Sequence, residues 1–292
     1  MPSSTLHAPV LAWYAEHARD LPWRAPGTSP WAVLVSEVML QQTPVARVQP
    51  VYLDWLRRWP APAGLAAEPA GEAVRAWGRL GYPRRALRLH EAATAIVDRH
   101  SGAVPSSYDD LLALPGVGSY TAAAVAAFAF GGRHAVVDTN VRRVLARAVS
   151  GSAQPAPALT TSEHRLAETL VPDDPAVASR WAVAVMELGA MVCTARSPDC
   201  GGCPVAGGCS WQTGGRPAYS GPVRRAQGYA GTDRQVRGRL LAVLREADGA
   251  VPAEVLDAVW ADAAQRRRAL AGLVADGLVE PLTDGSLRLP GG

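Results

Sequence analysis

The feature that most limits how this chain can fold is a tight cluster of cysteines. All four cysteines of the 292-residue sequence lie in one segment, in the order Cys193-x6-Cys200-x2-Cys203-x5-Cys209. A disulfide framework spreads its cysteines along the chain, whereas four thiols this close together are typical of a metal site. The number of cysteines alone suits zinc and an iron–sulfur cluster equally well. We therefore predict that this segment folds around a metal centre.

Helical patterns dominate the sequence before residue 215, and strand patterns are scarce. Met1–Val10 lacks the pattern of a signal peptide, and no apolar run is long enough for a transmembrane helix. We therefore expect an all-α protein in the cytoplasm. The predicted helices are Leu11–His17, Trp31–Gln42, Val45–Leu56, Ala73–Leu80, Arg85–Arg99, Tyr108–Leu114, Ser119–Phe130, Asn140–Ala148 and Ala176–Val192.

The chain changes character after the cysteines. Thr213–Gly221 has the Gly- and Pro-rich composition of a linker. We therefore predict that a linker at residues 216–230 separates two domains. Residues 231–292 form a small α+β module, whose pattern fits a winged helix and a plain three-helix bundle equally well. Its predicted elements are helices at Thr232–Glu246, Ala253–Trp260 and Ala263–Asp276, then a hairpin at Leu278–Leu289 turned at Asp284-Gly285.

A glycine-rich turn separates two of the predicted helices. The turn reads Leu114-Pro115-Gly116-Val117-Gly118 and has the pattern of a helix-hairpin-helix motif. Such a turn leaves backbone N–H groups exposed at the start of the next helix, where they can bind a DNA phosphate. The alternative is an ordinary helix–helix turn with no ligand.

Two acidic residues stand in positions that suit chemistry. Asp138 directly precedes a predicted helix, where an aspartate is more often only an N-cap. Glu37 stands among apolar residues of another helix, and burial there would raise its pKa and make it a general acid. Without further context, a solvent-facing glutamate on an amphipathic helix is the more common case.

Together these motifs resemble the endonuclease III superfamily of DNA glycosylases over about residues 8–215. In that superfamily the 6-2-5 cysteine spacing holds a [4Fe–4S] cluster, and the catalytic aspartate follows the hairpin as Asp138 follows Gly118. Two further segments resemble the adenine DNA glycosylase (MutY) family, namely Ser36–Thr43 (SEVMLQQT) and Leu21–Arg24 (LPWR). The implied fold is a six-helix barrel domain with the hairpin at residues 30–133. An iron–sulfur cluster domain would combine residues 1–29 with residues 134–215.

The resemblance also implies roles for individual residues. Glu37 would protonate adenine at N7, and Asp138 would stabilise the sugar cation or attack it. Gln42 would wedge into the duplex beside 8-oxoguanine, while Tyr82, assisted by Leu80, would stack against the damaged pair. The full set of predicted DNA or base contacts is Arg24, Gln42, Leu80, Tyr82, Gly116, Gly118, Tyr120 and Asn140.

The sequence contains no lysine, and this bears on the type of glycosylase reaction. Lys and Arg together number 29, and every one of them is arginine. Glycosylases of the superfamily that also cleave the strand carry a Schiff-base lysine at the position of Tyr120. The resemblance therefore implies a monofunctional enzyme. Arginine also favours forked phosphate contacts.

The implied function is hydrolysis of the N-glycosidic bond of adenine mispaired with 8-oxoguanine or guanine, leaving an abasic site in base excision repair. The implied partner is double-stranded DNA with such mispairs, and no membrane is involved. The protein would act as a monomer in the bacterial cytoplasm, at the nucleoid during repair. One alternative is a thymine/uracil-mismatch glycosylase of the same superfamily, which would lack the Ser36–Thr43 pattern. The other is a non-catalytic iron–sulfur DNA-binding protein, against which Glu37 and Asp138 both count.

The sequence departs from the adenine DNA glycosylase family in two places. Long members end in a domain resembling an 8-oxo-dGTP hydrolase, and residues 231–292 do not look like that fold. Arg266-Arg267-Arg268 in this module would serve as backbone contacts or as a solvated helix face. Val183 replaces the polar residue that many members use to reach the adenine. Adenine recognition would then depend more on Glu37 and on backbone groups.

Overall fold

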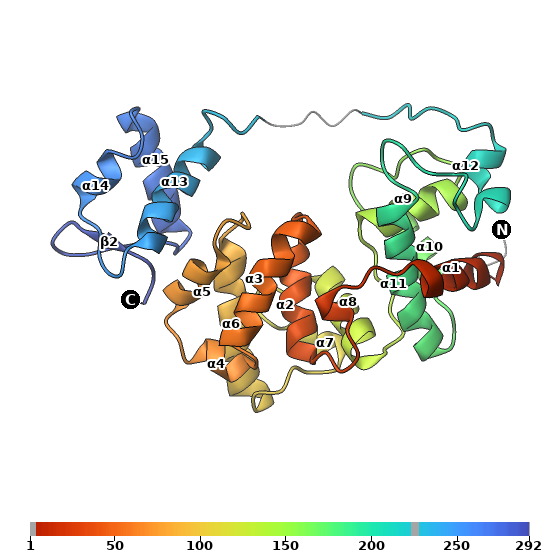
Figure 1. The fold of residues 1–292 in the computed structure, drawn as a ribbon, viewed down its shortest axis with the longest axis horizontal. Helices are drawn as coiled ribbons and strands as arrows, with labels where there is room; N and C mark the ends of the chain where they lie inside the picture. The colour runs from red at the N-terminus through yellow and green to blue at the C-terminus, as the bar shows by residue number, and fades with distance from the viewer. Residues whose placement is uncertain (1–3, 223–227, 292) are drawn as a thin grey trace. The chain divides into compact units, whose positions relative to one another are not determined.

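The structure is a computed structural model that describes residues 4–222 and 228–291. These residues are mostly helical, as predicted, and the two short strands among them lie near the C-terminus (Figure 1). Contacts divide the chain into two compact units. Unit 1 comprises Met1–Pro30, Ser106–Leu112 and Gly118–Arg224, and unit 2 comprises Trp31–Pro105, Ala113–Val117 and Arg225–Gly292. Unit 1 thus includes residues 118–133, which the sequence places in the six-helix barrel domain. The predicted domain boundaries stay a prediction.

Unit 1 is built around one long helix, α11 (Pro175–Met191), which packs against α1 and α9. Its core includes Trp13, Val144, Trp181 and Leu188, all buried. A second, alanine-rich cluster joins α8 to α11. The other helices of unit 1 are α1 (Ser4–His17), α7 (Tyr108–Leu112), α8 (Ser119–Phe130), α9 (Thr139–Ala148), α10 (Thr161–Thr169) and α12 (Ser210–Thr213), with 3₁₀ turns at Pro22–Arg24 and Ala206–Gly208.

Three helices of unit 1 begin at residues whose side chains cap them. Asp138 caps α9, and Asp174 caps α11 by accepting a hydrogen bond from Val177 N. Thr160 and Glu163 form a capping box at the start of α10, which the predicted helices do not include. That Thr-x-x-Glu pattern is the sequence signal that would have revealed this helix.

Unit 2 begins with a bundle of five helices around a tryptophan cluster. Trp55 packs edge-on against Trp59 and Trp77, with ring centroids 4.7 and 5.9 Å apart. All three rings are buried, so they fix the relative orientation of α3, α5 and the start of α4. The helices are α2 (Pro30–Leu40), α3 (Val45–Arg58), α4 (Pro62–Ala66), α5 (Ala70–Trp77) and α6 (Arg84–His100).

The C-terminal module of unit 2 has the element order of a winged helix. Its two strands pair antiparallel, and Val251, which follows the first helix, forms a β-bridge with Leu287. This bridge is absent from a plain three-helix bundle, so the structure favours the winged-helix alternative. The elements are α13 (Asp233–Glu246), α14 (Ala253–Asp257), α15 (Ala263–Ala275), β1 (Glu280–Pro281) and β2 (Leu287–Arg288).

The module contacts α5 through hydrogen bonds to backbone carbonyl oxygens. Gly71 N donates to Pro290 O at 2.7 Å, and Arg245 Nε donates to Val74 O at 2.9 Å. A Cβ at Gly71 would lie 2.7 Å from the Pro290 oxygen, so only glycine permits this approach. Part of the predicted linker, residues 223–227, lies outside the described residues. No helix within the described residues is long and apolar enough to span a membrane.

Candidate functional site

Asp138 is held at the start of α9 by two hydrogen bonds. Its Oδ1 accepts from Val141 N at 2.7 Å, which is the N-cap contact, and its Oδ2 accepts from Asn140 Nδ2 at 2.7 Å. Burial raises the pKa of Asp138, and the hydrogen bonds from Val141 and Asn140 oppose that rise. The carboxylate is therefore capped but poorly solvated, which leaves it able to stabilise a neighbouring cation.

A chain of hydrogen bonds links this carboxylate to the cysteine segment. Arg143 Nη2 donates to Asn140 Oδ1 at 2.8 Å, which fixes the orientation of the Asn140 amide. Arg143 Nε donates to Cys193 O at 2.6 Å, and Nη2 also donates to Gly189 O at 2.6 Å. Arg143 thus ties the carboxylate, α11 and the first cysteine to one guanidinium group.

Gly189 allows α11 to lie directly against the start of α9. A Cβ at Gly189 would lie 2.7 Å from Asn140 Cβ and 2.8 Å from Asn140 O. Any larger residue would therefore push apart the two helices that position Asp138 and Asn140.

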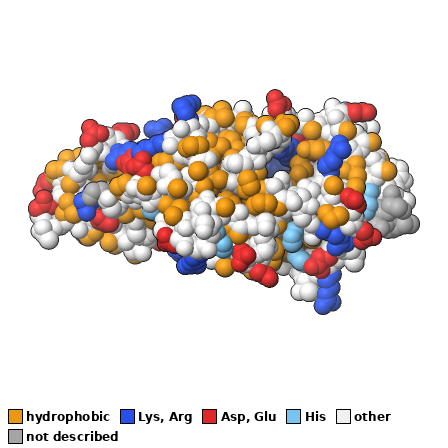
Figure 2. All heavy atoms as spheres, turned by 90° about the horizontal axis from the view of Figure 1, so that it is seen from below, with side chains coloured by type: hydrophobic (Ala, Val, Ile, Leu, Met, Phe, Trp, Pro, Cys, Tyr) orange, Lys and Arg blue, Asp and Glu red, His pale blue; other side chains and the backbone are white. Residues whose placement is uncertain are grey.

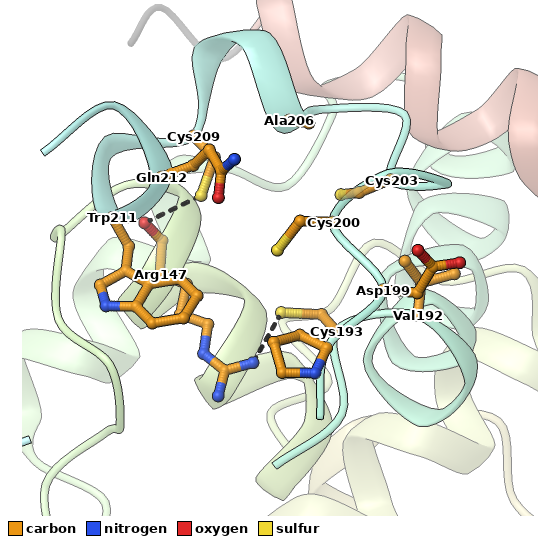
Figure 3. A pocket seen from close by; sticks show the side chains of 11 residues that line it. Arg147, Val192, Cys193, Asp199, Cys200, Cys203, Ala206, Cys209, Trp211 and Gln212 are labelled. Atoms are coloured by element: carbon orange, nitrogen blue, oxygen red, sulfur yellow. Dashed lines mark hydrogen bonds between the residues drawn. The ribbon is translucent and has the colours of Figure 1, made fainter. Parts of the chain in front are cut away.

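The four cysteines all line one cavity of unit 1 (Figure 3). None of the four forms a disulfide. Arg147 Nη1 donates to Cys193 Sγ at 3.4 Å, and Cys209 Sγ lies 3.4 Å from Arg147 O. The side chains that form the cavity come from the end of α9, the loop after α11 and the segment around α12.

The chemistry of these thiols fits an iron–sulfur cluster. Burial raises the pKa of Cys193, and it raises the pKa of Cys203 to about 11, with the neighbouring cysteines adding to both shifts. Four thiolates can therefore stay ionised together only around a strongly positive centre. No three His, Cys, Asp or Glu side chains of the described residues are placed to hold a single metal ion. Four cysteine thiolates around one cavity are the ligand set of a [4Fe–4S] cluster, in which each thiolate binds a different iron atom.

Glu37 lies in the middle of α2, which is buried along nearly its whole length. Its side chain is only 6% exposed, beside the buried Leu34 and Val38. The solvent-facing alternative is therefore wrong. A buried carboxyl group of this kind is the environment that a general acid requires at neutral pH.

The predicted wedge residues of unit 2 differ in their exposure. Gln42 is exposed just after α2, and Tyr82 is 53% exposed between α5 and α6, so Tyr82 is not a core tyrosine. Leu80 is only 3% exposed and belongs to the core. The prediction that Leu80 reaches DNA is therefore not supported by this conformation.

The glycine-rich turn has the expected backbone. Gly116 has a φ of +74°, and a Cβ there would lie 2.5 Å from Arg88 Cβ, so the turn requires glycine. Gly118 is exposed at the N-terminus of α8, with open space around it. Tyr120 lies in the first turn of α8 and packs against the alanine-rich cluster of unit 1.

Arginine is used differently from the prediction. Arg24 Nη2 donates to Glu187 Oε2 at 3.0 Å, and its side chain is mostly buried, which argues against a direct DNA contact. The interior arginines donate mainly to backbone carbonyls rather than facing outward. On the face drawn in Figure 2, some basic side chains lie beside acidic ones and others lie among apolar and neutral side chains. Arg268 is exposed and pairs with Asp233, which suits a solvated helix face, whereas the mostly buried Arg266 pairs with Asp257.

Glu187 is a fully buried carboxylate of unit 1 that its sequence pattern alone did not reveal. It stands in the apolar run Val185-Met186-Glu187-Leu188, the same kind of pattern that drew attention to Glu37. Glu187 Oε1 accepts from Arg19 Nε and Oε2 from Arg19 Nη2, each at 2.7 Å. Despite complete burial, these hydrogen bonds and charges lower the pKa of Glu187 to about 2. Its partners come from a distant part of the sequence, so the pairing had no local signal.

Comparison with known proteins places the chain in a family. The model of the HhH-GPD superfamily of base excision DNA repair proteins matches residues 35–168, and that of the iron–sulfur binding domain of endonuclease III matches residues 193–209. The adenine DNA glycosylase of Mycobacterium tuberculosis is 55% identical over 283 residues, covering 97% of this chain and 92% of that protein.

More distant relatives share the fold. The thymine/uracil-DNA glycosylase of Pyrobaculum aerophilum is 38% identical over 200 residues, covering 68% of this chain and 86% of its own. A solved structure of a thermostable thymine-DNA glycosylase matches with a TM-score of 0.64 and 28% identity, covering 73% of this chain and 97% of the other. The superfamily match and the high identity along nearly the whole chain show that this protein belongs to the adenine DNA glycosylase family and carries that family's iron–sulfur domain.

Proposed function

We propose that this protein is a monofunctional DNA glycosylase that removes adenine paired with 8-oxoguanine or guanine and leaves an abasic site. The observation that carries the proposal is the 55% identity to an adenine DNA glycosylase over nearly the full length of both chains. The absence of lysine supports the monofunctional reaction, because a strand-cleaving glycosylase of this superfamily needs an amine to form a Schiff base.

The proposed chemistry uses two carboxyl groups in different roles. The enzyme extrudes the adenine from the duplex, since its glycosidic bond cannot be reached within the stack. Glu37, buried in α2, donates a proton to the adenine and makes it a neutral leaving group. Asp138 stays ionised and stabilises the positive charge that develops on the sugar, or attacks it, before water completes the hydrolysis.

Other residues hold the DNA and these two groups. Asn140 orients Asp138 through its 2.7 Å hydrogen bond. The exposed Gln42 and Tyr82 fill the gap that the extruded base leaves. The backbone around Gly116 and Gly118 binds a phosphate, and Tyr120 contacts the flipped nucleotide. The four cysteines hold the [4Fe–4S] cluster, which stabilises the fold of the surrounding loop.

Excision of thymine or uracil from mismatches is the second candidate. It is supported by the 38% identity to a thymine/uracil-DNA glycosylase and by the fold shared with a thymine-DNA glycosylase. The Ser36–Thr43 segment, which resembles adenine DNA glycosylases and contains Glu37, favours adenine.

One assay separates these reactions. The purified protein is incubated with duplexes that carry A opposite 8-oxoguanine, A opposite G, T opposite G or U opposite G, and the strands are then treated with alkali. We expect cleavage only of the adenine strands, and none before alkali. Cleavage of the thymine or uracil strand would support the second candidate. Binding without release of any base would contradict both. Size-exclusion chromatography coupled to light scattering tests whether the protein acts as a monomer.

A further inference from the structure

Two exposed residues of unit 2 share a backbone conformation that residues with side chains rarely adopt. Gln42 has a φ of +55° and Tyr82 has a φ of +47°. Non-glycine residues reach this left-handed region at an energetic cost, and they stay there only where surrounding contacts hold them. The two turns lie far apart in the sequence, yet one side chain of unit 2 contacts both of them.

Arg85, in the first turn of α6, provides this contact on the side of Gln42. Its Nη1 donates to the carbonyl oxygens of Val38, Met39 and Gln41 at 2.8, 3.1 and 2.6 Å. Because α2 ends at Leu40, the carbonyls of its last turn lack helical N–H partners. The guanidinium of Arg85 therefore acts as a C-terminal cap for α2.

The second terminal nitrogen of Arg85 faces the turn that carries Tyr82. Nη2 donates to Thr43 Oγ1 at 3.0 Å and to Gly81 O at 3.1 Å. Its guanidinium also lies over the Tyr82 ring, 5.6 Å from the centroid. One side chain thus touches the residue after Gln42 and the residue before Tyr82.

Only an arginine can make this set of contacts. Its planar fork carries donors on two terminal nitrogens in fixed directions, whereas the single ammonium of a lysine cannot reach both turns at once. Trp77 lies below the guanidinium, 5.1 Å away, and its Nε1 donates to the same Gly81 oxygen at 2.9 Å. Burial lowers the pKa of Arg85 to about 10, so the group remains charged at neutral pH.

We propose that Arg85 is a positioning residue that joins the Gln42 and Tyr82 turns into one rigid wedge. The inference rests on the proposed function, in which both side chains fill the gap left by the extruded adenine. Arg85 acts only through them: it presets both turns before DNA binds, so that neither has to be ordered during base extrusion.

The test is whether the effect of Arg85 disappears when the wedge side chains are removed. Single-turnover adenine release is measured for the wild type, Arg85→Lys, the Gln42→Ala/Tyr82→Ala double variant and the triple variant. We expect Arg85→Lys to slow release by about tenfold or more, but to slow the double variant by less than about twofold. An equal loss in both backgrounds would mean a general structural role and would overturn the proposal, as would a wild-type rate for Arg85→Lys.

A second measurement reads wedge insertion without requiring catalysis. A duplex with an uncleavable adenine analogue carries 2-aminopurine beside the mispair, and its fluorescence rises when the neighbouring bases unstack. We expect the rise with wild-type protein and with Arg99→Lys, an exposed control at the other end of α6, and a reduced rise with Arg85→Lys. An unchanged rise with Arg85→Lys contradicts the proposal.

These two readouts also separate this inference from the proposed function. A wild-type protein that unstacks the duplex but releases no adenine would contradict the proposed function. The fluorescence comparison between wild type and Arg85→Lys would still test whether Arg85 positions the wedge. Melting curves of each variant show that the protein is folded. Arg85→Gln, which keeps one amide donor, replaces Arg85→Lys in the same measurements if the lysine variant does not fold.

Discussion

Unit 1 contains one fully buried and one partly buried carboxylate, and their surroundings shift the two pKa values in opposite directions. Glu187 is fully buried, yet two arginines from the N-terminal segment bind it and lower its pKa to about 2. Asp138 has no arginine in direct contact; it is held by a backbone N–H and the Asn140 amide, and burial raises its pKa.

The difference shows how one unit can hold two acidic residues for two purposes. The charge of Glu187 is already balanced, so it has little left to offer a substrate and instead ties α11 to the N-terminal segment. Burial leaves the Asp138 charge poorly solvated, and in the proposed mechanism this charge stabilises the cation that forms on the sugar. In this proposal, a free energy cost in the resting protein becomes stabilisation of the transition state.

The strongest way to break this comparison is to remove the charge of Asp138. Asp138→Asn should slow adenine release by roughly 10³-fold or more, because the developing sugar cation loses its counter-charge. Asp138→Ser should also lose activity, but it keeps an N-cap oxygen for Val141 and removes a poorly solvated charge. We therefore expect the free energy of unfolding of Asp138→Ser at pH 7 to equal or exceed that of the wild type. Chemical denaturation checks this, and a clear loss of stability would contradict the comparison.

The next largest effect should come from Glu187→Gln, which we expect to lower stability without removing the chemistry. A pKa lowered from 4.5 to about 2 corresponds to about 3 kcal/mol of unfolding free energy at pH 7. Chemical denaturation measures the loss, and Glu16→Gln, at an exposed position of α1, is the matched control that should change little. If Glu187→Gln and Glu16→Gln unfold alike, the ion pairs do not stabilise unit 1.

Gly189→Ala should moderately lower stability and disturb the residues that position Asp138. The new methyl group would meet the Asn140 backbone, so α9 and α11 must separate, at a cost of roughly 1–3 kcal/mol. Because this shift displaces Asn140, we also expect adenine release to slow in the folded fraction. A variant that loses stability but keeps the wild-type rate would show that the placement of Asn140 does not matter for catalysis.

The smallest expected effect is a pH dependence of the unfolding free energy that comes from Glu187. The folded pKa of Glu187 lies below its unfolded value of 4.5, so its stabilisation is present above that value and is lost as the pH falls toward about 2. The stability gap between wild type and Glu187→Gln should therefore be constant from pH 7 to 6 and should narrow by about 1.4 kcal/mol per pH unit well below 4.5. A gap that widens on acidification would contradict the sign of the shift. Denaturation curves at several pH values measure it.

The sequence predicts the parts of this molecule that have local causes. The hairpin turn requires glycine at Gly116, and the helical patterns place most of the α-helices. The cysteine spacing predicts a metal centre, and the apolar neighbours of Glu37 indicate burial, although a solvent-facing glutamate is the more common case in such a helix.

What the sequence could not show are contacts between distant segments. Arg19 and Arg24 bind Glu187, which lies 168 and 163 residues further along the chain, and Arg85 of α6 binds the end of α2. From the sequence, arginine looks like a phosphate ligand, whereas these side chains act as internal donors to carbonyl and carboxylate oxygens. Leu80 likewise gives no local sign of its burial, because the residues that cover it are set by the packing of unit 2.

The central claim is that Asp138 performs chemistry while Glu187 supports the fold. It is tested most directly by measuring single-turnover adenine release from a duplex with A opposite 8-oxoguanine, well below the melting temperatures of all variants. The account predicts that Glu187→Gln stays within about threefold of the wild-type rate, whereas Asp138→Asn falls by roughly 10³-fold or more. Near-normal release by folded Asp138→Asn, or an equally deep loss in folded Glu187→Gln, would contradict it.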